Sequence, residues 1–105
     1  MSQPNEASAL ALLNAKLDDR SAIVAVVGLG YVGLPMAVEL GKADFTVVGV
    51  DVSEKKIATI DAGESDVKDV PAFEVAGLRA TGKLTGSTDF SVISKADVVI
   101  VCPLR

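Results

Sequence analysis

The 105-residue sequence has no histidine, one cysteine and 4 % aromatic residues, and each scarcity excludes something. Without histidine, and with Cys102 alone, the chain lacks the residue types of structural zinc sites. The carboxylates of Asp66, Asp69 and Glu74 show no metal-ligand spacing, so we expect no metal. A lone cysteine cannot form an internal disulfide, and nothing points to secretion. Because aromatic residues are so scarce, the core must be aliphatic.

The sequence also lacks an excess of positive charge and a long unbroken apolar run. Its formal net charge is −4, which argues against a nucleic-acid partner because such partners need a basic surface. The longest apolar stretch, residues 22–38, contains three glycines and Pro35, whereas a membrane span needs about 20 unbroken apolar residues. Residues 1–20 carry acidic side chains and no basic leader, so we expect no signal peptide. By default we expect a cytoplasmic protein with no membrane partner.

Short apolar runs alternate with stretches of helical spacing. The runs predict strands at Ala22–Val27, Phe45–Val50 and Ala96–Cys102, with a weaker edge strand at Leu84–Ser87. Apolar residues three and four apart predict helices at Tyr31–Lys42, from Ser53 to Gly63 and from Pro71 to Gly82. Ser53 is placed as the N-cap of the second helix, and Asp89 is placed to cap one helical turn. Strands that alternate with helices require parallel pairing, right-handed crossovers and helices on both sheet faces.

The chain is long enough for one domain and too short for two. We divide it into residues 1–20, an amphipathic helix with a lead-in, and residues 21–105, the domain itself. The helix is predicted over Glu6–Leu17, where Ala7, Leu10, Leu13 and Leu17 form an apolar stripe. Such a stripe packs on its own domain more often than it pairs with another subunit.

Gly28, Gly30 and Gly33 form a G-x-G-x-x-G motif between the first strand and the following helix. The motif is weak alone, but here the next strand ends in Asp51, 23 positions after Gly28. Gly28 would allow the turn, Gly30 the approach of a pyrophosphate, and Gly33 close packing of helix on strand. The phosphates would then meet free N–H groups at the positive helix end. The alternative is that the glycines serve packing only.

Asp51 is placed to accept both hydroxyls of an adenosine ribose and to repel a 2′-phosphate, which favours NAD over NADP. Lys55 and Lys56 are nearby cations that could tolerate the extra phosphate. The alternative is a surface aspartate that only caps the next helix, although the spacing favours the ribose role. Cys102 ends the third strong strand, but without a histidine base we expect an inert buried thiol and assign no catalytic residue.

Four segments resemble the N-terminal NAD-binding domain of the UDP-glucose/GDP-mannose dehydrogenase family. They are VVGLGYVGLPMAVEL (Val26–Leu40), GVDVSEKK (Gly49–Lys56), GES (Gly63–Ser65) and GSTDFSVISKADVVIVC (Gly86–Cys102). The segment GLGYVGLP is the most specific of them. The lead-in helix, and GES with DVP nearby, are more similar to the UDP-N-acetylglucosamine or UDP-N-acetylmannosamine dehydrogenase branch.

The resemblance implies a Rossmann-type α/β three-layer domain with a parallel sheet, half of a doubly wound fold, that binds NAD. It implies that Lys56 and Thr88 contact NAD, and that Tyr31 and Val32 lie at backbone positions over the pyrophosphate. The whole enzyme would oxidise the C6 alcohol of a UDP-sugar to a carboxylate in two NAD-dependent steps, through a thiohemiacetal on a cysteine.

The sequence departs from the family after Cys102. A V-P-T-P-like segment, whose threonine lies near the nicotinamide, is replaced by Pro103, Leu104 and Arg105. The family's catalytic cysteine, lysine and sugar-binding residues belong to downstream domains without a counterpart here. We therefore expect a fragment that binds NAD without catalysis, the UDP-sugar being bound only by the whole enzyme. An open strand edge adds the hypothesis of a homodimer.

Two other functions share these sequence features. One is a different NAD-dependent dehydrogenase, of the 3-hydroxyacid or 6-phosphogluconate type, against which GLP and GES count. The other is a non-catalytic domain that senses NADH or ATP by changing its dimer packing, like the regulatory domain of a potassium channel. Dimerisation that follows NADH would favour the sensor, and a downstream sugar-binding domain would exclude it.

Overall fold

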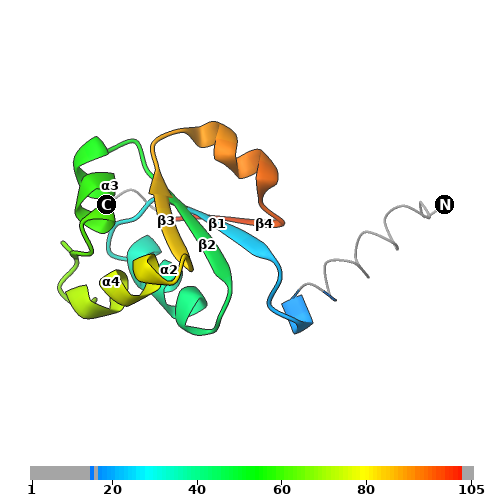
Figure 1. Cartoon of the computed structure of the whole chain (residues 1–105). Coiled ribbons are helices and arrows are strands. Elements are labelled where there is room, and N and C mark those ends of the chain that lie inside the picture. The colour runs from blue at the N-terminus through cyan, green and yellow to red at the C-terminus, as the bar shows by residue number, and fades with distance from the viewer. Residues whose placement is uncertain (1–14, 16, 103–105) are drawn as a thin grey trace.

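Four short parallel strands organise the computed structural model, which describes residue 15 and residues 17–102 (Figure 1). The strands are β1 (Ile23–Val27), β2 (Thr46–Val50), β3 (Leu84–Ser87) and β4 (Val98–Val101). They lie in the order β3-β2-β1-β4, and each neighbouring pair is parallel. The predicted parallel sheet is confirmed, with the weak strand Leu84–Ser87 at one edge.

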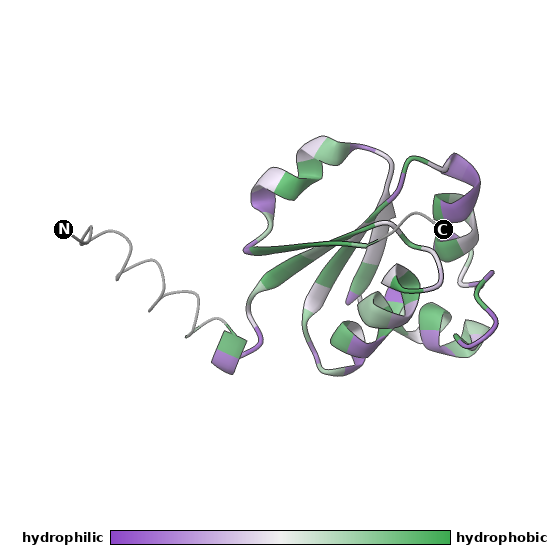
Figure 2. Ribbon diagram, turned by 180° about the vertical axis from the view of Figure 1, so that it is seen from behind, coloured by the Kyte–Doolittle hydropathy of each residue, from purple (hydrophilic) through white to green (hydrophobic). Residues whose placement is uncertain are grey.

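Three α-helices and one 3-10 helix connect the strands. They are α2 (Gly33–Lys42), α3 (Glu54–Asp61), α4 (Ala72–Ala80) and the 3-10 helix η1 (Phe90–Lys95). Helix α2 contacts β1, β2 and β3, while α3 and α4 contact β3 and each other, so all three cover one face. Figure 2 shows η1 across the sheet from them. The predicted helix over residues 6–17 falls mostly outside the described residues.

The turn predicted after Asp89 is longer than expected and has 3-10 geometry. The Asp89 carboxylate accepts a hydrogen bond from the Ser91 N–H at 2.9 Å. Hydrogen bonding with the Ser91 side chain, and after it with this N–H, holds the Asp89 pKa below its ordinary value. The carboxylate therefore caps η1 as the sequence predicted. Within residues 17–102, no helix is long and apolar enough to cross a membrane.

The core lies between the sheet and the three α-helices. Val24, Val26 and Val47 point from the strands toward Leu34 and Val38 of α2, and all five are at most 2 % exposed. Side chains alternate along a strand, so their neighbours point to the face that carries η1. Burying one such aliphatic side chain contributes about 1.5–3 kcal/mol, which makes this layer the main source of stability.

Candidate functional site

The carboxyl ends of β1, β2 and β3 meet at one edge of the sheet. The pairing continues past the strand ends, because the Gly28 N–H donates to the Val50 carbonyl at 2.8 Å and the Asp51 N–H donates to the Ser87 carbonyl at 3.2 Å. Gly28, Asp51 and Thr88, which follow the three strands, are thereby brought to the same edge. In open α/β sheets this is the edge that binds ligands.

The loop from Gly28 to Gly33 makes a tight turn between β1 and α2. Gly28 has a φ of +93°, a conformation that favours glycine. A Cβ on Gly33 would lie 1.5 Å from the Gly28 carbonyl oxygen, so a larger residue does not fit. Val32 is the N-cap of α2 and no side chain caps the helix. The positive end of α2 is therefore left to an acceptor from outside the helix.

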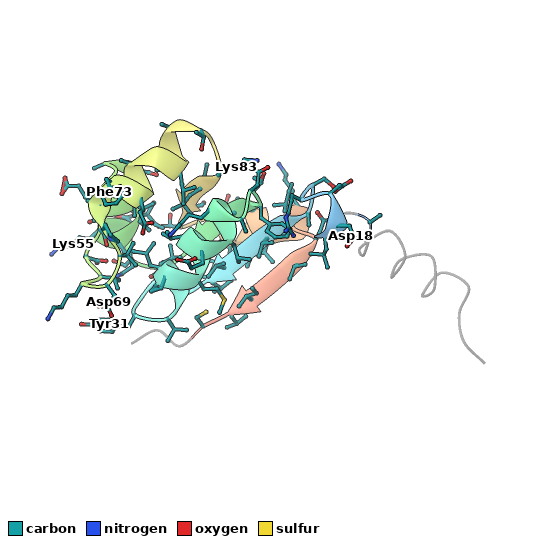
Figure 3. The ribbon with its side chains drawn as sticks, turned by 90° about the horizontal axis from the view of Figure 1, so that it is seen from below. Asp18, Tyr31, Lys55, Asp69, Phe73 and Lys83 are labelled. Carbon is teal, nitrogen blue, oxygen red and sulfur yellow. The ribbon has the colours of Figure 1, made fainter. Side chains whose placement is uncertain are left out.

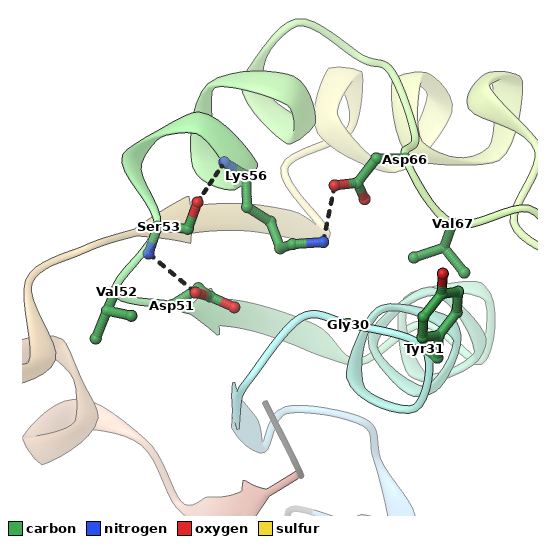
Figure 4. A pocket seen from close by; sticks show the side chains of 8 residues that line it. All are labelled: Gly30, Tyr31, Asp51, Val52, Ser53, Lys56, Asp66 and Val67. Atoms are coloured by element: carbon green, nitrogen blue, oxygen red, sulfur yellow. Dashed lines mark hydrogen bonds and ion pairs between the residues drawn. The ribbon is translucent and has the colours of Figure 1, made fainter. Parts of the chain in front are cut away.

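Asp51 is a buried charge, with 6 % of its surface exposed. One carboxylate oxygen accepts a hydrogen bond from the Leu29 N–H and the other from the Ser53 N–H, each at 2.9 Å. Figure 4 marks the bond from Ser53. The carboxylate thus ties the glycine loop to the start of α3 and keeps further lone pairs on both oxygens. Helix α3 itself is capped by Ser53, whose Oγ accepts from the Lys56 N–H at 3.1 Å.

A cavity of about 380 Å³ opens beside Asp51 (Figure 4). Its lining comes from the glycine loop, the end of β2 with the first turn of α3, and the loop between α3 and α4: Gly30, Tyr31, Asp51, Val52, Ser53, Lys56, Asp66 and Val67. The Lys56 Nζ and an Asp66 carboxylate oxygen form an ion pair at 2.8 Å. Two acidic side chains and one basic side chain therefore line it.

The structure separates the predicted cofactor-binding residues into two groups. Half of them line the cavity: Gly30, Tyr31, Asp51 and Lys56. The rest lie outside its lining: Gly28, Val32, Gly33 and Thr88. Of these, Gly28 and Gly33 shape the loop, Val32 begins α2, and Thr88 is exposed after β3.

Sequence reasoning missed three lining residues and gave Ser53 only a capping role. Val52 directly follows Asp51 and is 67 % exposed, so its position after the predicted ribose aspartate was an available signal. Asp66 and Val67 have no such signal, because they belong to the loop between α3 and α4. Only the folding of that loop back toward α3 brings them to the cavity.

Cys102 lies beside this edge but does not line the cavity. It is 5 % exposed, and its N–H donates to the Val27 carbonyl at 2.8 Å. This burial agrees with the expectation of an inert thiol packed inside the domain. Among the residues that the structure describes, no group of three or more acidic, cysteine or histidine side chains is arranged to hold a metal ion.

A buried strand, a glycine turn, an uncapped helix N-terminus and a buried aspartate on the neighbouring strand together define a Rossmann-type dinucleotide-binding domain. The family model described as "UDP-glucose/GDP-mannose dehydrogenase family, NAD binding domain" matches residues 22–103. The chain therefore belongs to the UDP-glucose/GDP-mannose dehydrogenase family, as the resemblance predicted, and the matched region is its NAD-binding domain.

Two curated relatives illustrate the match. UDP-N-acetyl-D-glucosamine 6-dehydrogenase of Pseudomonas aeruginosa is 44 % identical over 78 residues, which are 74 % of this chain and 18 % of that protein. GDP-mannose 6-dehydrogenase of Pseudomonas syringae pv. tomato is 42 % identical over 82 residues, covering 75 % and 18 % of the two chains. The chain thus spans about a fifth of the length of these relatives.

Solved structures agree with the fold. A ternary complex of GDP-mannose dehydrogenase from Pseudomonas aeruginosa superposes with a TM-score of 0.72 at 38 % identity, over 76 % of this chain and 19 % of that one. A UDP-D-ManNAc dehydrogenase from Pyrococcus horikoshii gives a TM-score of 0.71 at 28 % identity, with the same coverage. These matches favour the nucleotide-sugar dehydrogenases over the hydroxyacid dehydrogenases and nucleotide sensors weighed above.

Proposed function

We propose that this domain holds NAD with the pyrophosphate at the N-terminus of α2 and the adenosine ribose in the cavity beside Asp51. The observation that carries the proposal is the buried Asp51 carboxylate, which is 6 % exposed and oriented by two backbone N–H groups. A buried carboxylate costs free energy unless it is well bonded. Its fixed orientation at the ligand-binding edge supports a recognition role.

The glycine loop fits a pyrophosphate. Gly33 leaves no room for a Cβ, which supports a loop held close to β1, and Gly30 lines the cavity without a side chain. The side chains of Tyr31 and Val32 are 73 % and 49 % exposed, so they do not fill the loop. Backbone N–H groups at these positions, together with the dipole of α2, would stabilise the phosphate charge.

The cavity fits the adenosine ribose. Asp51 would accept the ribose hydroxyls on its remaining lone pairs, and Lys56 would reach the same sugar from α3. Val52 offers an exposed apolar surface at the cavity wall, which suits an adenine ring. Thr88, exposed after β3, is assigned to the cofactor by its match to the family pattern alone.

The enzyme to which this domain belongs would oxidise the C6 alcohol of a nucleotide sugar, a UDP-sugar, to the carboxylate. Bound NAD would supply the two-electron acceptor for each of the two successive steps of that oxidation. The residues of this chain bind and orient the cofactor, and none is assigned to the chemistry on the sugar. The names of the relatives, which are UDP-N-acetyl-D-glucosamine and GDP-mannose 6-dehydrogenases, support this reaction class.

We also propose a cytoplasmic protein that does not bind nucleic acid or membranes and that forms a homodimer. The net charge of −4 and the single buried thiol support the cytoplasmic location and the absence of nucleic-acid and membrane partners.

The homodimer proposal rests on the edge strand β4. There Val99 and Val101 are 44 % and 75 % exposed and can be covered by a second copy. Light scattering at high concentration tests the dimer, and a monomeric mass contradicts it.

Calorimetric titration of NAD and NADP into the chain tests the cofactor site. We expect saturable NAD binding, weaker NADP binding, and at least about tenfold weaker NAD binding after Asp51→Ala, which corresponds to roughly 1.4 kcal/mol. Asp18→Ala, an exposed aspartate away from the cavity, is the matched control and should bind NAD normally. Circular dichroism establishes that each variant is folded. A folded wild-type chain without saturable NAD binding would contradict the proposal.

A further inference from the structure

A second carboxylate reaches the cavity from a distant part of the chain. Asp66, in the loop between α3 and α4, places one carboxylate oxygen 2.8 Å from the Lys56 Nζ (Figure 4). Both side chains line the cavity. The Lys56 side chain is 20 % exposed and that of Asp66 is 45 % exposed, so the ion pair lies at the cavity mouth, partly shielded from water.

The loop around Asp66 is anchored. Val67 and Val70 are each 5 % exposed and pack in the hydrophobic core. The Ser65 hydroxyl accepts from the Val67 N–H at 3.2 Å and donates to the Val67 carbonyl at 3.1 Å. Asp66 lies between Ser65 and Val67, which are joined by these two hydrogen bonds. The backbone of Asp66 is therefore fixed, and the fold directs its carboxylate at Lys56.

This pairing changes the charge that a bound nucleotide meets. In the described lining, Lys56 is the basic residue, and Asp51 and Asp66 are the acidic ones. Lys55, the other cation that sequence reasoning offered to a 2′-phosphate, is exposed and does not line the cavity. A ribose hydroxyl can donate to carboxylates, but a 2′-phosphate would meet two negative charges and a cation that is already neutralised.

We propose that Asp66 is a positioning residue for cofactor specificity, which pairs with Lys56, withholds that cation from a 2′-phosphate and so favours NAD over NADP. The inference rests on the proposed function, because it requires the adenosine ribose to lie beside Asp51 and Lys56. It assigns part of the discrimination to a loop outside the glycine motif and the ribose aspartate.

Asp66→Asn tests the inference, with Asp69→Asn as the matched control in the same loop. Both variants remove one negative charge, but Asp69 is exposed and does not line the cavity. We expect Asp66→Asn to tighten NADP binding by about three- to tenfold, with NAD binding changed by less than about twofold. Asp69→Asn should leave the ratio of the two dissociation constants unchanged. A merely structural role of Asp66 would weaken both nucleotides together and leave that ratio intact.

A double-mutant cycle separates the route through Lys56 from a direct effect of the Asp66 charge. In a Lys56→Met background no cation is left to release, so we expect Asp66→Asn to change the NAD-to-NADP ratio by less than about twofold. An undiminished change in that background contradicts the inference. Saturable NAD binding with an unchanged ratio in Asp66→Asn also contradicts it while leaving the proposed function intact. Absence of NAD binding by the unsubstituted chain contradicts the proposed function itself.

Discussion

The two ends of the parallel sheet hold their charged groups in different ways. Figure 3 shows Tyr31 and Lys55 on one side of the domain and Asp18 on the opposite side. At the carboxyl end, Asp51 is almost completely buried and bonded to two backbone N–H groups. At the amino end, the ion pair between Lys83 and Asp44 leaves the Asp44 side chain 74 % exposed. Asp97, also at the amino end, resembles Asp51 in that its carboxylate accepts a hydrogen bond from a backbone N–H, that of Ile23, but Asp97 is only partly buried.

This difference shows which charges mark a functional site. Exposed ion pairs contribute about 0–1 kcal/mol each and occur anywhere on a surface. A buried carboxylate persists only where the fold supplies hydrogen-bond donors, so its position carries more information. Substitutions of buried groups at the carboxyl end should therefore lower the free energy of unfolding more than those at the amino end. They should also weaken NAD binding.

Gly33→Ala should have the largest effect. The new Cβ would lie 1.5 Å from the Gly28 carbonyl oxygen, so the glycine loop or α2 must move. We expect a loss of more than about 3 kcal/mol in the free energy of unfolding, measured by urea denaturation, and loss of NAD binding. The control is Gly77→Ala in α4, where an added Cβ meets nothing within 4 Å. It should stabilise the chain by about 0.5–1 kcal/mol.

Asp51→Asn should have the next largest effect. An amide keeps one acceptor oxygen but turns an N–H donor toward the Leu29 or Ser53 N–H group, both of which need an acceptor. We expect a loss of about 1–3 kcal/mol by chemical denaturation. Asp44→Asn at the amino end should stay within about 0.5 kcal/mol of the wild type. Equal losses of stability in Asp51→Asn and Asp44→Asn would contradict the proposed difference between the buried and the exposed aspartate.

Ser53→Ala should have a smaller effect, confined to the start of α3. The hydroxyl accepts from the Lys56 N–H at 3.1 Å, and alanine leaves that donor without its cap. We expect a loss of about 1 kcal/mol in the free energy of unfolding, measured by thermal or urea denaturation. Ser53→Thr keeps a capping oxygen and should recover most of the stability. An alanine variant as stable as the threonine variant would show that the cap contributes little.

Asp44→Gly should have the smallest effect, and it should be stabilising. Asp44 follows α2 with a φ of +77°, and its N–H donates to the Gly41 carbonyl at 2.9 Å, as in a helix C-terminus that favours glycine. We expect a gain of about 0.5 kcal/mol in the free energy of unfolding, because glycine relieves the strained conformation. Lys83→Ala removes the ion pair together with the exposed hydrogen bond from the Lys83 Nζ to the Asp44 carbonyl, and it should change stability by less than about 0.5 kcal/mol. A net loss in Asp44→Gly would mean that the ion pair outweighs the strain.

Much of the fold could be predicted because its signals are local. The run AIVAVV and the following glycine determine β1, and FTVVGV before Asp51 determines β2. The sequence predicts the start of α2 two residues early, at Tyr31 rather than Gly33. The Leu34 N–H donates to the Gly30 carbonyl at 3.2 Å, but Pro35 has no N–H to continue the helical pairing with Tyr31. The resemblance carried by GLGYVGLP identified the family, which the family model confirmed.

The sequence by itself thus determined the type and order of the elements, the glycine turn and Asp51, because turn chemistry and periodicity act over a few residues. Only the tertiary structure decided that three α-helices share one face and that Asp66 pairs with Lys56. The pairing of Asp66 with Lys56 depends on Val67 and Val70, whose side chains are buried in the core and hold the loop between α3 and α4 beside the cavity. No local pattern encodes that return, because the free energy that drives it comes from packing between distant segments.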